Sequence, residues 1–123
     1  MRVVLADNDP DALELLELDL RLEGHVIVAT VADGAAAVDA CDDLRPDVLV
    51  VDHRMPPGID GVEAARRVLA ARSARHVIVY SNYVDPAVVA SAESIGARWL
   101  RKGDLARLRA AVRVDHGRPG SGA

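Results

Sequence analysis

Short apolar runs alternate along the chain with longer segments in which apolar residues recur every three or four positions. Three of the short runs are continuous and rich in β-branched residues, which is typical of strands covered on both faces. The expected strands are 2–6, 25–31, 48–51, 77–80 and 97–100. The expected helices are 11–23, 34–44, 61–72, 86–95 and 104–114. This alternation predicts an α/β fold with a parallel sheet, helices on both faces and right-handed crossovers.

Capping residues agree with these boundaries. Asp9 and Asp85 each place a capping carboxylate directly before a proline that suits the first helical turn. Gly24 and Gly96 stand where the first and fourth helices are expected to end.

The composition narrows the class of protein. The chain has 123 residues, of which 50% are apolar and 28% charged, so we expect one folded domain with its own core. A single cysteine excludes an internal disulfide framework, and no apolar run approaches the length of a membrane helix. Acidic residues come too early for a signal peptide. We expect a soluble cytoplasmic domain at 1–115, followed at 116–123 by a flexible tail or the start of a linker.

Charge is distributed unevenly. Residues 1–61 carry 14 acidic and 4 basic side chains, whereas residues 62–123 carry 5 acidic and 11 basic ones. Of the 15 Lys and Arg residues, Lys102 is the one lysine. Phe is absent, so the core must be built mainly from Ala, Val, Leu and Ile.

Polar residues collect where the expected strands end, which is where doubly wound sheets bind their ligands. Asp7 and Asn8 follow the first strand, Asp52 the third, Ser81 the fourth and Lys102 the fifth. Neighbouring carboxylates attract a hard cation such as Mg²⁺, and an ammonium and a hydroxyl suit phosphoryl oxygens. This combination of groups is suited to forming and binding an aspartyl phosphate.

Four segments carry a resemblance to a known family. They are VVLADNDPDALELL (3–16), PDVLVVDHRMPPGIDG (46–61), HVIVYS (76–81) and GARWLRKGD (96–104). On these segments the sequence resembles the receiver domain of bacterial two-component response regulators, over essentially residues 2–115. The resemblance implies a flavodoxin-like five-stranded parallel sheet of order 2-1-3-4-5 with five helices.

The resemblance also implies a role for each residue of the pocket. Asp52 is expected to be the phosphoacceptor, and Lys102 is expected to bind the phosphate. Mg²⁺ is expected to be held by Asp7, Asn8, Asp52 and the backbone carbonyl of Arg54.

A second set of residues is expected to respond to the phosphoryl group or to cover it. Ser81 corresponds to the switch hydroxyl, which also binds the phosphate, and Trp99 to the aromatic switch position. Arg54, Asn82 and Tyr83 are expected to flank the pocket.

Three features depart from the family pattern. Asn8 stands in place of the second acid, so we expect weaker Mg²⁺ binding. The loop 56–60 carries one extra residue, which could shift the start of the third helix. The strand-five segment is one residue shorter than usual, and Gly103 replaces a frequent proline.

We therefore expect a non-enzymatic signalling switch. It would accept a phosphoryl group on Asp52 from a histidine kinase or phosphotransfer protein and pass the change to a downstream effector domain or protein. A homodimer is also possible. Neither direct nucleic-acid binding nor membrane association is expected.

Two alternatives remain. One is a receiver-like interaction module that is not regulated by phosphorylation. The feature that supports this alternative is Asn8 in the second acidic position. The other is a haloacid-dehalogenase-type phosphatase that would use Asp7 as nucleophile and Asp9 as general acid and base.

Overall fold

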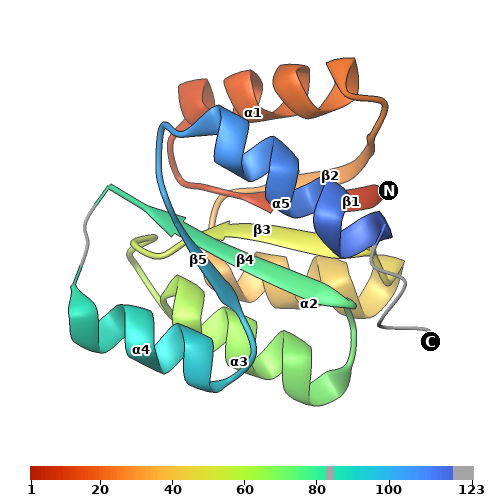
Figure 1. Cartoon of the computed structure of the whole chain (residues 1–123). Coiled ribbons are helices and arrows are strands. Elements are labelled where there is room, and N and C mark those ends of the chain that lie inside the picture. Colours follow the sequence, from red (N-terminus) through yellow and green to blue (C-terminus); the bar gives the residue numbers. More distant parts are fainter. Residues whose placement is uncertain (83–84, 118–123) are drawn as a thin grey trace.

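A five-stranded parallel sheet lies between two layers of helices in the computed structural model, which describes residues 1–82 and 85–117, with side chains up to Arg113 in the last helix (Figure 1). The strands are β1 (Arg2–Ala6), β2 (Val26–Val31), β3 (Val48–Asp52), β4 (His76–Ser81) and β5 (Arg98–Arg101). Their order is β2-β1-β3-β4-β5, and every neighbouring pair is parallel. The expected fold is therefore confirmed.

Five helices cover the two faces of this sheet. They are α1 (Pro10–Leu22), α2 (Gly34–Leu44), α3 (Gly61–Ala71), α4 (Pro86–Ser94) and α5 (Leu105–Gly117). In Figure 1, α1 and α5 lie on one face, and α2, α3 and α4 lie on the other. Each helix belongs to a crossover between parallel strands or, for α5, follows the last strand.

Side-chain caps explain where the helices begin. Asp9 accepts a hydrogen bond from the Asp11 backbone N–H at 3.0 Å, and Asp85 accepts one from Ala87 at 2.9 Å. These caps bear out the proposed helix starts. Asp33 caps α2 in the same way, which the sequence did not single out.

The expected boundaries differ from the structure mainly at strand and helix ends. β4 is one residue longer at each end than expected, and α5 continues through residues 116 and 117, where the sequence predicts a tail. The rest of that tail, 118–123, lies outside the described residues.

Alternation along β4 divides the core into two layers. Ile78 and Tyr80 pack with the helix residues of α1 and α5, whereas Val77 and Val79 pack with those of α2, α3 and α4. Cys41 lies in the second layer, where burial and then the nearby Asp42 charge raise the pKa of its thiol to about 12. This cysteine is a packing residue with an inert thiol.

Within the described residues, no helix is both long and apolar enough to cross a membrane.

Candidate functional site

The carboxyl ends of four strands hold polar residues that the sequence singles out. Asp7 follows β1, Asp52 ends β3, and Ser81 ends β4. Lys102 follows β5, and its backbone N–H donates a hydrogen bond to the Ser81 carbonyl at 2.9 Å. Because β1, β3, β4 and β5 are adjacent and parallel, all four residues lie along one edge of the sheet.

A single ammonium group joins two buried carboxylates at this edge. Nζ of Lys102 lies 2.8 Å from Oδ2 of Asp7 and 3.3 Å from Oδ2 of Asp52. Asp7 is fully buried, and Asp52 is only 6% exposed. Buried charges of this kind persist only while they are paired, so Lys102 holds the cluster together.

Asp7 is surrounded by protein donors. The Tyr80 hydroxyl donates to Oδ2 of Asp7 at 2.7 Å, so this oxygen is shared with Lys102. The Asp9 backbone N–H donates to Oδ1 at 2.9 Å. The sequence reasoning missed Tyr80 as a site residue. Because successive residues of a strand face opposite sides of the sheet, Tyr80 and Ser81 lie on different faces of β4. This alternation alone does not show that the phenol of Tyr80 reaches the Asp7 carboxylate.

The two carboxylates have pKa values displaced in opposite directions. Burial acts to raise the pKa of Asp7, but hydrogen bonds from Lys102, Tyr80 and the Asp9 backbone outweigh it and leave this pKa lowered. Burial raises the pKa of Asp52, the Asp7 charge raises it further, and Lys102 offsets only part of the rise. The difference follows from hydrogen bonding to the charged form.

The two donors that contact Asp7 also keep their protons. Burial lowers the pKa of Lys102, but its hydrogen bond to Asp7 and the charge of Asp52 leave this pKa raised. Burial and the hydrogen bond to Asp7 raise the pKa of Tyr80 well above its ordinary value. At neutral pH Asp7 is therefore a carboxylate, Lys102 an ammonium and Tyr80 a neutral phenol.

Other residues that the sequence singles out surround this cluster. Asn8, Arg54 and Asn82 are exposed. A hydrogen bond from the Arg54 backbone reaches the Asp52 carboxylate. Tyr83, which the sequence places beside the pocket, lies outside the described residues.

The two expected switch residues lie on adjacent strands. Ser81 is buried, and Trp99 is partly buried in register with Val79, on the α2, α3 and α4 side. The Trp99 ring lies 5.6 Å from the imidazole of His53, the residue after Asp52, at an interplanar angle of 60°. Trp99 Nε1 is buried and has no hydrogen-bond partner among the residues that the structure describes. Trp99 is thus well placed to report changes at Asp52.

The loop after Asp52 is closed by a glycine. The Gly61 N–H donates to the His53 carbonyl at 2.8 Å. A Cβ at Gly61 would lie 2.7 Å from the His53 Cα and would also overlap the Asp52 carbonyl oxygen. Only glycine fits here without moving the backbone of the Asp52 segment. Despite the extra loop residue, α3 begins at Gly61, as expected.

The donor set of this edge fits a hard divalent cation. Asp7 and Asp52 supply carboxylates, and the Arg54 carbonyl and the Asn8 amide would supply neutral oxygens, which are the ligands that Mg²⁺ prefers. No group of three or more His, Cys, Asp or Glu gathers anywhere in the described part of the chain. Mg²⁺ prefers octahedral coordination and usually keeps several waters, so water would complete a set of four protein oxygens.

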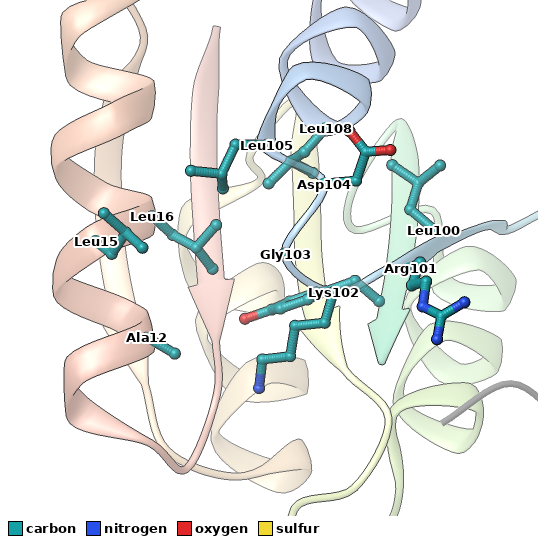
Figure 2. A pocket seen from close by; sticks show the side chains of 11 residues that line it. Ala12, Leu15, Leu16, Leu100, Arg101, Lys102, Gly103, Asp104, Leu105 and Leu108 are labelled. Atoms are coloured by element: carbon teal, nitrogen blue, oxygen red, sulfur yellow. The ribbon is translucent and has the colours of Figure 1, made fainter. Parts of the chain in front are cut away.

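A mostly apolar cavity of about 160 Å³ adjoins the cluster on the α1 and α5 side (Figure 2). Figure 2 shows leucines of α1 on one side and leucines of α5 on the other, with Lys102 extending along the wall. The cavity is lined by Ala12, Leu15, Leu16, Tyr80, Leu100, Arg101, Lys102, Gly103, Asp104, Leu105 and Leu108. Tyr80 and Lys102 thus belong both to the cavity wall and to the charged cluster.

Comparisons with known proteins agree with the fold. Residues 3–113 match the model of the response regulator receiver domain. A solved structure of the signal receiver domain of NarL from Mycobacterium tuberculosis superposes with a TM-score of 0.85 at 33% identity, covering 95% of this chain and 97% of that one.

Two curated relatives show the same similarity in sequence. The transcriptional regulatory protein NarL of Mycobacterium tuberculosis is 37% identical over 98 residues, which are 79% of this chain and 45% of NarL. The DNA-binding response regulator MtrA of Mycolicibacterium smegmatis is 33% identical over 124 residues, covering 96% of this chain and 53% of MtrA. The chain spans about half the length of these relatives.

Proposed function

The chain belongs to the response regulator receiver family, and from that premise we propose that it is a phosphorylation-dependent switch with Asp52 as the phosphoacceptor. The observation that carries this proposal is the contact of Lys102 with both Asp7 and Asp52. Two carboxylates and a compact cation lie together in this contact, which supports a role for Asp52 as the nucleophile. Such an arrangement suits the transfer of a phosphoryl group more than it suits passive packing.

The transfer itself requires little from the protein beyond positioning. One Asp52 oxygen attacks the phosphorus atom of a phosphohistidine on the partner, so the P–N bond breaks and a P–O bond forms. The raised pKa of Asp52 marks a carboxylate whose negative charge is poorly compensated. The Lys102 ammonium and the Ser81 hydroxyl would then bind the new phosphoryl oxygens.

Receiver domains generally bind Mg²⁺ at their acidic pocket, and the donor set here fits this ion. Asp7, Asp52, the Arg54 carbonyl and the Asn8 amide would hold it. When bound, the ion would neutralise charge on the incoming phosphoryl group. With Asn8 in the second acidic position, we expect weaker binding than two acids would provide.

Phosphorylation would then act on a two-state equilibrium through Ser81 and Trp99. Movement of either residue would alter the surface made by α4, β5 and α5. Arg54 and Asn82 would flank the phosphoryl group, and Arg54 would shield it from water. This would be signalling rather than turnover of a substrate, so the domain itself would not be an enzyme.

A histidine kinase or phosphotransfer protein is the partner that this chemistry requires. NarL and MtrA are named as a transcriptional regulatory protein and a DNA-binding response regulator. On that basis the receiver would pass its change to a downstream effector domain or protein, and any contact with DNA would belong to that effector and not to this domain.

Incubation with Mg²⁺ and acetyl phosphate, followed by intact mass and Trp99 emission, tests the proposal. We expect a mass increase of one phosphoryl group and a change in emission, both absent from Asp52→Asn. A phosphoryl group trapped on Asp7 would instead support the phosphatase alternative.

One observation favours a second candidate, the interaction module that is not regulated by phosphorylation. Asn8 removes an acid, and protein donors already occupy both Asp7 oxygens. Absence of any mass increase, together with unchanged partner binding by Asp52→Asn, would favour this candidate over the switch.

A further inference from the structure

The Tyr80 hydroxyl makes a contact that the proposed switch does not require. It donates to Oδ2 of Asp7 at 2.7 Å, and both side chains are buried, with 3% of Tyr80 and none of Asp7 exposed. The hydrogen bond joins β4 to the residue after β1, across the intervening strand β3. A hydrogen bond from a neutral phenol to a buried carboxylate stabilises the charged acid without adding charge.

This contact completes the set of donors to Oδ2 of Asp7. Oδ2 accepts from Tyr80 and contacts Lys102, and Oδ1 accepts from the Asp9 backbone N–H. A carboxylate has about four lone-pair sites, two on each oxygen, so both sites of Oδ2 are engaged while Oδ1 keeps one. A cation that coordinates Oδ2 must therefore compete with donors that are already in place.

Packing holds the phenol in position. The Tyr80 ring belongs to the core layer under α1 and α5, and Nζ of Lys102 lies 5.3 Å from its centre. Tyr80 is also in register with Asp52 on the neighbouring strand. Because the ring is already ordered, its hydroxyl is presented to Asp7 at little further cost in conformational entropy.

The cavity beside the Tyr80 ring leaves space for a second position of the ring, in which the hydroxyl no longer contacts Asp7. It measures about 160 Å³ and is lined by Tyr80 together with Leu16, Leu105 and Leu108. A well-packed core would not let a buried ring tilt, whereas this gap offers room for it to move without displacing β4. The hydroxyl can thus leave Oδ2 when another ligand takes its place.

We propose that Tyr80 is a positioning residue that holds Asp7 in a metal-free arrangement and competes with Mg²⁺ for its Oδ2 oxygen. This inference rests on the proposed metal pocket, in which Asp7 is a ligand. The weaker Mg²⁺ binding that we expect would then have two causes, the loss of a ligand charge at Asn8 and the occupation of a ligand oxygen by Tyr80.

Calorimetric titration of the unphosphorylated protein with MgCl₂, without any phosphodonor, tests this role. Tyr80→Phe removes only the hydroxyl, and we expect its Mg²⁺ dissociation constant to fall about tenfold relative to wild type, as befits loss of one hydrogen bond to a charged group. Tyr80→Leu, a second variant without the hydroxyl, should change affinity in the same direction. Ser73→Ala is the matched control, because it deletes another buried hydroxyl that bonds elsewhere, to the Val68 carbonyl. It should leave the affinity unchanged.

Equal or weaker Mg²⁺ binding by Tyr80→Phe, or no binding by either protein, would overturn the inference. Its failure is distinguishable from failure of the switch. If wild type gains a phosphoryl group on Asp52 but Tyr80→Phe shows no gain in Mg²⁺ affinity, only the role of Tyr80 is disproved. If wild type is never phosphorylated but Tyr80→Phe binds Mg²⁺ more tightly, only the switch is disproved.

Discussion

Asp7 and Asp52 contact the same ammonium, yet their surroundings differ sharply. Asp7 receives a phenol hydroxyl and a backbone N–H in addition to Lys102, and its pKa is lowered. Asp52 contacts Lys102 at the longer distance of 3.3 Å, and its pKa is raised. The protein thus stabilises one anion by its own donors and leaves the other undercompensated. An undercompensated carboxylate is the one that gains most from an added cation.

Replacing Lys102 with Met should have the largest effect, because both carboxylates then lose their common countercharge. Removal of one partner from a buried charge cluster typically costs 3–5 kcal/mol, and we expect a loss of about 3 kcal/mol in the free energy of unfolding. Urea denaturation at pH 7 measures it. Lys102→Arg is the control: it keeps the charge and should lose less than half as much. Equal losses would show that shape, and not charge, matters at this position.

Replacing Asp7 with Asn should destabilise the fold by about 2 kcal/mol, because the amide keeps an acceptor for Tyr80 but gives up the ion pair with Lys102. The same denaturation experiment at pH 7 measures this loss. A more stable Asp7→Asn protein would contradict the proposed difference between the two acids.

Most of the fold follows from the apolar pattern of the sequence. β1, β3 and β4 are buried on both faces, so their continuous apolar runs mark them clearly. The edge strands β2 and β5 are partly exposed, and their ends are less sharply marked. The end of α5 also differed from its prediction, since residues 116 and 117 remain helical.

The candidate site was predictable to a lesser degree. Parallel topology alone brings Asp7, Asp52 and Lys102 to one edge, so their proximity follows from the order of strands. The contact of Tyr80 with Asp7 does not follow, because it depends on strand twist and on the length of the phenol. The packing of Trp99 against His53 likewise depends on the exact spacing of layers.

Asp52→Asn should act in the opposite direction from Asp7→Asn. At pH 7 we expect it to stabilise the protein by about 1 kcal/mol, since a carboxylate with a raised pKa is charged at a cost to folding. In wild type, protonation of Asp52 removes this cost as the pH falls through its raised pKa toward the ordinary value of 3.8. The advantage of the variant should therefore shrink over that range and disappear below pH 3.8, where the carboxyl is protonated in both the folded and the unfolded protein.

Denaturation curves at several pH values follow this difference. Asp39→Asn, which neutralises an exposed carboxylate on α2, is the control and should show little change at any pH. A stabilisation by Asp52→Asn that stays constant with pH would mean that ionisation of Asp52 is not its cause.

Asn8→Asp should have the smallest effect on stability and sharpens the comparison by adding a third acid. Asn8 is exposed, so water screens most of the new charge, and we expect less than about 1 kcal/mol of destabilisation in EDTA. Mg²⁺ should reverse that loss, because a third carboxylate near Asp7 and Asp52 raises affinity for a hard cation. Thermal unfolding with and without MgCl₂ measures both effects, and Asn82→Asp, another exposed amide that follows a strand, controls for added charge alone. If Mg²⁺ stabilised both variants equally against thermal unfolding, position 8 would have no special part in the metal pocket. The lowered pKa of Asp7 would then depend on its protein donors alone.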